Sequence, residues 1–249
     1  MCELLGFSAA EKHDISKQMI EFFSHSISNP HGWGLMLDDD IFKGCEKADD
    51  SKELRRILSN REKYRTVMGH IRFATVGSIS PQNCHPFTAC DITGRRWTLI
   101  HNGTIYKGSR LVRFMTTQQG DTDSERMFLY MMECFDRAQI HGGLCAHDRF
   151  ELMDKLVREL SVSNKLNLMI YDGELLYIHK NMKQTMVYRK LDSGYIFSTY
   201  PLDDEEWSDV EMTRLYAYKN GELVFKGIKH NAYFEPTLQY IKATDAMNI

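Results

Sequence analysis

The chain has 249 residues, 43% of them hydrophobic and 26% charged, and its formal net charge is −3. This is the composition of a globular protein, and the charge creates no field that would attract a phosphate backbone, so we expect neither nucleic-acid binding nor disorder. No apolar run approaches membrane-spanning length. The first residues, MCELLGFSAAEKHD, lack the positive region and long apolar core of a secretory signal, so we expect a cytoplasmic protein.

The six cysteines lie at positions 2, 45, 84, 90, 134 and 145. No spacing among them is typical of a zinc pair or of a redox C-x-x-C motif. A cytosolic chain of this size does not need disulfides, so we expect six reduced thiols.

The first half of the chain predicts strands separated by helices. CELLGF (2–7) and GWGLML (32–37) are short apolar strands, and β-rich segments follow at 66–77 and 97–105. Helical spacing is present at 13–27 and at 50–60, where Asp50 or Ser51 is a candidate cap. The apolar face of the first helix consists of Ile15, Met19, Phe22, Phe23 and Ile27.

The second half predicts two helices and then two hairpins. The helices cover 121–138, with Thr122 or Asp123 as its cap, and 147–160. The hairpins are centred on Asp172-Gly173 and on Asn220-Gly221, dipeptides typical of type I′ turns. This order favours sheets packed together with helices outside them. Since the sequence has no repeat and no Pro/Gly/Ser-rich linker, we expect one domain.

Cys2 has two interpretations. It is a small buried hydrophobe at the start of the first strand, or it is the first residue of a chain that has lost Met1. In the second case one residue carries both a thiol nucleophile and a free α-amine that acts as its base.

Two segments each contain one candidate site residue, an arginine in the first and a histidine in the second. Arg72, in GHIRFATVG (69–77), has the planar fork that binds a carboxylate, or it is a solvated arginine at a strand end. His85, in NCHPF (83–87), is a structural hydrogen-bonding residue or a ligand. A dyad or metal pair with Cys84 is disfavoured, because neighbours on an extended chain point to opposite faces.

Two further segments carry polar groups at element ends. Asn102 and Gly103, in HNG (101–103), form either a hairpin turn or an oxyanion hole made of a side-chain amide and a backbone N–H. The acidic residues of GDTDSE (120–125) cap a helix, or one of them binds a substrate ammonium group. Taken together, the four segments and Cys2 fit an α-amino acid whose side chain carries a cleavable acyl group.

The chain resembles the class II, N-terminal-nucleophile glutamine amidotransferases, and among them the stand-alone YafJ-like family. The resemblance is carried, in order, by MCELLGF, HGWG (31–34), GHIRFATVG, NCHPF, HNG, TDSE (122–125) and FSTYPLDDEEW (197–207). It implies an α+β fold, a four-layer αββα sandwich of the N-terminal nucleophile hydrolase type. It also implies that residues 1–249 form a single glutamine amidotransferase type 2 domain, with no metal and no organic cofactor.

The resemblance also assigns roles to residues. It implies that Cys2 is the catalytic nucleophile after Met1 is removed, and that Asn102 and Gly103 form the oxyanion hole. Arg72 matches the arginine that binds the substrate carboxylate, and Asp123 matches the aspartate that binds its α-amino group.

Further positions match with less defined roles. Thr75 follows close behind the arginine, and His85 and Trp33 match family positions near the site. Val76 stands where multi-domain relatives often have a histidine, so any role of that histidine is absent here.

The expected reaction is hydrolysis of the glutamine side-chain amide through a Cys2 thioester, releasing glutamate and ammonia. Two alternatives remain at this stage: hydrolysis of γ-glutamyl peptide or amine conjugates, and a non-enzymatic module that binds glutamine and regulates. The expected partners are glutamine or a γ-glutamyl compound, with an ammonia-accepting synthase subunit and a second copy of the chain as candidates. Neither nucleic acid nor a membrane is expected as a partner.

Overall fold

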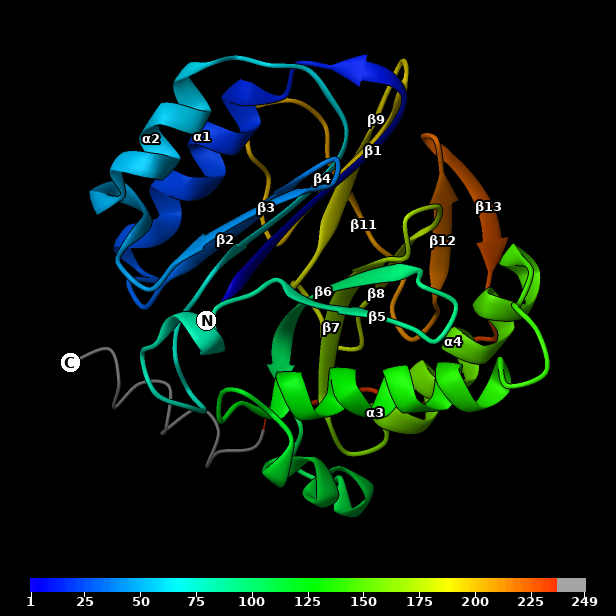
Figure 1. The fold of residues 1–249 in the computed structure, drawn as a ribbon. Coiled ribbons are helices and arrows are strands. Elements are labelled where there is room, and N and C mark those ends of the chain that lie inside the picture. Colours follow the sequence, from blue (N-terminus) through cyan, green and yellow to red (C-terminus); the bar gives the residue numbers. More distant parts are fainter. Residues whose placement is uncertain (237–249) are drawn as a thin grey trace.

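The computed structural model describes residues 1–236, which form four layers (Figure 1). Two antiparallel sheets lie face to face, and helices cover the outer face of each. α1 (Ser16–Ser24) and α2 (Lys52–Ser59) cover one sheet, and α3 (Asp123–Ala138) and α4 (Ala146–Ser161) cover the other. Short 3-10 helices lie at His25–Ile27, Ala48–Asp50, Pro81–Asn83 and Ser109–Thr116. The expected αββα fold class is confirmed.

The first sheet is built around the N-terminal strand. Its strands are β1 (Glu3–His13), β2 (Trp33–Leu37), β3 (Asp40–Gly44), β4 (Tyr64–Ile71), β9 (Val187–Leu191), β10 (Gly194–Ser198) and β11 (Ser208–Asp209). Their order is β11-β9-β10-β1-β4-β2-β3. Since β1 is hydrogen-bonded on both sides, the start of the chain is held at the centre of the sheet.

The second sheet contains the remaining described strands. They are β5 (Phe87–Cys90), β6 (Arg96–Thr104), β7 (Lys165–Tyr171), β8 (Leu176–His179), β12 (Tyr216–Lys219) and β13 (Glu222–Lys226), in the order β13-β12-β8-β7-β6-β5. β6 and β7, far apart in sequence, pair from Thr98↔Tyr171 to Thr104↔Lys165.

Strand alternation divides the apolar residues into three cores. The helix-facing cores are centred on Phe22 and Trp33 in one half and on Phe128 and Phe150 in the other. The inter-sheet core contains Leu4, Met36, Met68, Ile100, Met169 and Phe197. Burial of this apolar surface on both faces of each sheet is the main stabilising term of the fold.

Helix starts follow the predicted capping chemistry. The hydroxyl of Ser51 accepts a hydrogen bond from the Leu54 N–H, and that of Thr122 accepts one from the Glu125 N–H. One predicted core residue is wrong: Ile27 is 74% exposed. α1 ends at Ser24 and passes into a 3-10 turn, which rotates Ile27 out of the buried face.

The two hairpins differ in their turns. Asn220 (φ 48°) and Gly221 (φ 75°) form the predicted two-residue turn with two positive φ angles. The type I′ prediction is wrong at Asp172-Gly173, where only Gly173 has positive φ and four residues separate the paired strands. The Asp172 carboxylate fixes this loop by accepting the Glu174 and Leu175 N–H groups.

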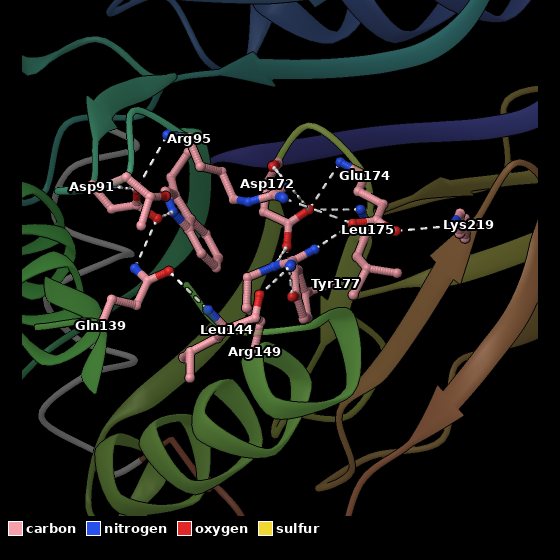
Figure 2. A network of polar contacts seen from close by, with 12 residues as sticks. Asp91, Arg95, Gln139, Leu144, Arg149, Asp172, Glu174, Leu175, Tyr177 and Lys219 are labelled. Atoms are coloured by element: carbon pink, nitrogen blue, oxygen red, sulfur yellow. Dashed lines mark hydrogen bonds and ion pairs between the residues drawn. The ribbon is translucent and has the colours of Figure 1, made fainter. Parts of the chain in front are cut away.

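Asp172 is also the centre of a polar network between the β7–β8 loop and the start of α4 (Figure 2). Its other carboxylate oxygen accepts hydrogen bonds from Arg149 Nε and the Tyr177 hydroxyl, at 2.8 and 2.9 Å. Arg149 also pairs with Glu174, which binds the exposed Lys219. Because Asp172 follows the last residue of β7, this network lies at the opposite end of that strand from Lys165.

All six cysteines are free thiols. No helix within residues 1–236 is both long and apolar enough to span a bilayer.

Candidate active site

The start of β1 and the end of β4 bring Cys2 and Arg72 to the inner face of the first sheet. The two strands are antiparallel, with Glu3 paired to Ile71. Leu4 and Met68 belong to the inter-sheet core. Alternation along each strand therefore directs the even-numbered residues nearest this end, Cys2 and His70, towards the second sheet.

Cys2 makes a reciprocal contact with Phe73. The Phe73 N–H donates to Sγ at 3.3 Å, and the thiol donates to the Phe73 carbonyl at 3.4 Å. Burial raises the pKa of the Cys2 thiol, while the Phe73 contact and the charges of Lys165 and Arg72 act in the opposite direction. These neighbours would stabilise a thiolate once it forms.

Arg72 is buried, with 3% of its surface exposed, which excludes the solvated strand-end interpretation. Its Nη1 donates to the Ser78 carbonyl at 2.9 Å, and its Nη2 donates to the carbonyls of Val76 and Gly77 at 3.1 and 3.3 Å. The guanidinium therefore anchors the loop that follows β4. Asp121 holds the same loop by accepting the Ser78 N–H at 3.1 Å.

Asn102 and Gly103 lie within β6, opposite Asn167 and Leu166 of β7, so the hairpin-turn interpretation is wrong. Asn102 is 2% exposed. Its Oδ1 accepts from Lys165 Nζ at 3.0 Å, whereas its Nδ2 is buried and has no acceptor within residues 1–236. An unsatisfied buried donor is costly, and here it is available for an acceptor on a ligand.

The backbone of Gly103 is turned away from β7. The N–H of Leu166, the residue opposite Gly103, donates to Asn181 Oδ1, and the Leu166 carbonyl accepts a hydrogen bond from His179 Nδ1. Both of these partners lie on the β8 side of β7. By the alternation of an antiparallel ladder, the Gly103 N–H then points towards the β5 side, where pairing with β6 ends at Leu99. A Cβ at Gly103 would lie 2.0 Å from the Lys165 carbonyl oxygen, so only glycine fits.

Asp123 is the first residue of α3 and lies beside the end of β6. Its carboxylate accepts the Ile105 N–H at 2.6 Å, whereas the cap of the helix is Thr122. Ser124 Oγ and His101 Nδ1 are 2.9 Å apart, which ties the start of α3 to β6. A hollow of about 300 Å³ borders Asp123 and is lined also by Tyr106, Met115 and Arg126, among others.

The remaining expected site residues are not all gathered around Cys2. Thr75 is exposed in the loop after β4. His85 packs against His70, with ring centroids 4.1 Å apart and the rings tilted by 34°. Trp33 packs against Phe23 in the helix-facing core and donates to Glu46 at 2.9 Å, so its described contacts belong to the core.

Lys165 is the site residue that the sequence analysis missed. It is 1% exposed, and besides Asn102 it donates to Met1 Sδ at 3.1 Å, so it connects the N-terminus with β6. Burial lowers its pKa to about 8. The available signal was a lysine at the head of a mostly apolar strand, KLNLMIY.

No group of three or more His, Cys, Asp or Glu side chains within the described part of the chain is arranged to hold a metal ion. The chemistry available here is that of a thiol, a buried amide donor, a guanidinium and a carboxylate. That combination suits acyl transfer from an amino-acid substrate.

The chain is similar to proteins of one known family. The family described as class II glutamine amidotransferases matches residues 1–195. YafJ of Escherichia coli (strain K12) is 28% identical over 207 residues, covering 78% of each chain.

Two solved structures share the fold. A predicted glutamine amidotransferase from Pseudomonas aeruginosa has a TM-score of 0.60 at 20% identity, with 90% of this chain and 100% of that chain covered. The glutamine phosphoribosylpyrophosphate amidotransferase of B. subtilis has a TM-score of 0.63 at 15% identity, with 90% of this chain and 48% of that chain covered.

Proposed function

The chain belongs to the class II glutamine amidotransferases, and from this we propose that it hydrolyses the side-chain amide of glutamine through a thioester on Cys2, releasing glutamate and ammonia. The observation that carries the proposal is the buried Asn102 Nδ2, a donor without an acceptor within residues 1–236. It belongs to the residue that Lys165 holds, and the charge of Lys165 also acts on the Cys2 thiol. A tetrahedral oxyanion formed on the substrate is the acceptor that such a donor suits.

The reaction begins with a proton leaving the Cys2 thiol. The α-amine of Cys2, with a reference pKa of roughly 7.7–8.0, is partly neutral near physiological pH and takes that proton through a water molecule. The thiolate attacks the amide carbon, and the oxyanion accepts hydrogen bonds from Asn102 Nδ2 and the Gly103 N–H. Collapse expels ammonia and leaves a γ-glutamyl thioester, which water then hydrolyses to glutamate.

Arg72 and Asp123 hold the substrate head group in this proposal. The guanidinium binds the α-carboxylate and the carboxylate binds the α-ammonium group. Both are buried, and both are anchored by backbone groups of the segments that follow β4 and β6. Charge-assisted bonds in such a setting select an amino acid over an uncharged amide.

Removal of Met1 is part of the proposal. While Met1 is attached, the nitrogen of Cys2 is an amide without basic character. The base is then absent, and burial, which raises the pKa of the thiol, disfavours the thiolate.

The test uses the purified protein with glutamine and measures glutamate release, together with intact mass. Active protein should lack Met1, a glutamine-analogue electrophile should label Cys2 and none of the other five cysteines, and Cys2→Ala should abolish turnover without unfolding. Full activity at a mass that still includes Met1 would overturn the mechanism. Rapid cleavage of γ-glutamyl peptides with glutamine left intact would identify a conjugate hydrolase instead.

The ammonia acceptor is proposed to be a separate synthase subunit. This chain covers 48% of the B. subtilis phosphoribosylpyrophosphate amidotransferase, whose name states a second substrate besides glutamine. Glutaminase activity of the isolated chain should accordingly be slow and should rise when the partner is added. Turnover unchanged by any candidate synthase would favour a stand-alone hydrolase.

A further inference from the structure

Lys165 and Asn102 face each other diagonally across β6 and β7. Thr104 is paired with Lys165, and Asn102 lies two residues earlier on the same face of β6. Further along this face Ile100 and Met169 lie in the inter-sheet core. The face is therefore apolar in its middle and polar at the end where Asn102 and Lys165 lie.

The hydrogen bond between these two residues fixes the orientation of the Asn102 amide. A lysine ammonium has only donors, so at 3.0 Å it must meet the oxygen, Oδ1, and not the NH2 group. The same bond leaves Nδ2 turned away from the lysine, buried and without an acceptor within residues 1–236. An amide rotated by 180° would place an NH2 group against a cation.

The backbone of Asn102 is held as well. Asn167 Nδ2 donates to the Asn102 carbonyl at 3.0 Å, and Asn167 is itself fixed by accepting the Asn181 N–H at 3.2 Å. With the main chain restrained in this way, the remaining freedom is rotation of the side-chain amide. Lys165 restrains that rotation.

We propose that Lys165 is a positioning residue, which holds the Asn102 amide so that its Nδ2 is preorganised to donate to the oxyanion of the substrate. This inference rests on the proposed function, because it assigns to Lys165 a part in the same reaction. Preorganised donors cost no reorganisation at the moment of reaction, which is why their fixation affects the rate of the chemical step. Burial lowers the pKa of Lys165 to about 8, so most of the population is charged at pH 7.

The kinetic test compares the wild type with Lys165→Met, which keeps the length and apolar bulk of the side chain and removes the donor. Loss of one oxyanion donor typically lowers kcat by about 100- to 1000-fold, so loss of its fixation should lower kcat by about 10- to 100-fold, with KM changed by less than about threefold. Lys180→Met is the matched control. Lys180 is also fully buried, but its ammonium donates to the Met186 carbonyl and to Asp209.

A double-mutant cycle then shows whether Lys165 acts through Asn102. If it does, Lys165→Met should add less than about twofold to the loss already caused by Asn102→Ala. Fully additive losses would overturn the proposal, because they would mean that Lys165 acts independently, for example through its charge on the Cys2 thiolate. Because the charge of Lys165 also favours the Cys2 thiolate, Lys165→Met should slow Cys2 alkylation by iodoacetamide, which needs no oxyanion donor, but by a smaller factor than it lowers kcat. Equal losses in alkylation rate and in kcat would overturn the proposal.

An NMR measurement, which needs no turnover, tests the contact between Lys165 and Asn102 independently of the proposed reaction. The ¹⁵N resonance of the Asn102 side-chain amide, assigned by its loss in Asn102→Ala, should shift or broaden in Lys165→Met and stay in place in Lys180→Met. An unchanged resonance in folded Lys165→Met would overturn the positioning role. A wild type that releases no glutamate, while the Asn102 resonance still responds to Lys165→Met, would refute the proposed function and leave the positioning contact established.

Discussion

At the scale of the residue, Arg72 and Asp123 are polar groups with buried anchoring contacts on either side of the proposed substrate. Each replacement that removes a charge-assisted hydrogen bond should cost roughly 1.5–3 kcal/mol of transition-state binding, or about 10- to 100-fold in kcat/KM. We expect this loss for Asp123→Asn and for Arg72→Lys, because a lysine point charge does not reproduce the planar fork. Steady-state kinetics with glutamine measure it.

Arg65→Lys, at an exposed arginine of β4, the strand that precedes Arg72, is the control for the arginine variant and should leave the kinetics unchanged. Near-wild-type kcat/KM in Arg72→Lys would reduce that residue to its observed role as an anchor of residues 76–78. Near-wild-type kinetics in Asp123→Asn would likewise leave only its bond to the Ile105 N–H.

Replacement of Asn102 distinguishes stabilisation of the transition state from binding of the substrate in its ground state. Asn102→Ala should lower kcat by about 100- to 1000-fold with a smaller change in KM, because the donor acts mainly on the transition state. The comparison of kcat and KM under saturating and limiting glutamine measures this. A change confined to KM would indicate that the amide binds ground-state substrate.

At the scale of the element, the ionic network at the far end of β7 fixes the loop that joins β7 to β8 and the start of α4. Arg149→Ala would remove the buried guanidinium 2.8 Å from the Asp172 carboxylate and leave only Arg95, at 3.8 Å, as its charged partner, which should lower the free energy of unfolding by about 3 kcal/mol. Urea unfolding followed by circular dichroism measures the loss. The residual folded fraction should keep the wild-type kcat, since this network and Lys165 lie at opposite ends of β7.

Lys219→Met supplies the matched control within the same network. Lys219 is exposed and pairs only with Glu174 among its described ion pairs, so its loss should cost less than about 1 kcal/mol. Equal losses for Arg149→Ala and Lys219→Met would contradict the assignment of stability to the buried pair.

At the scale of the whole molecule, the buried histidines make stability depend on pH. Burial lowers the pKa of His70 and His179 to about 3 and that of His101 to about 4, from 6.5. The unfolded chain therefore binds more protons than the folded chain below pH 6.5. Stability is fully present above that pH and is lost as pH falls towards the folded values.

At pH 5 each of these groups should lower the free energy of unfolding by up to about 2 kcal/mol relative to pH 7. Urea titrations at the two pH values measure the difference, and His147→Gln, at an exposed site, should not alter it. Equal stability at pH 7 and pH 5 would be inconsistent with three neutral buried imidazoles.

The sequence by itself determined the local elements and the order of the chemical groups. Periodicity predicted α3 and α4, because helix periodicity depends on residues within one or two turns. Local chemistry also limited the caps to Asp50 or Ser51 and to Thr122 or Asp123, and the structure selects Ser51 and Thr122. The motifs that carry the family resemblance were likewise readable in order, and the expected αββα fold is present.

Features that depend on contacts between distant parts of the chain were decided only by the tertiary structure. HNG is a common turn sequence, and only its pairing with β7 keeps Asn102 and Gly103 within a strand. The same pairing brings Lys165 to Asn102, and no local pattern relates residues so far apart in the chain. Trp33 packs towards α1 because alternation assigns a side chain to a face only after the sheet has acquired its neighbours.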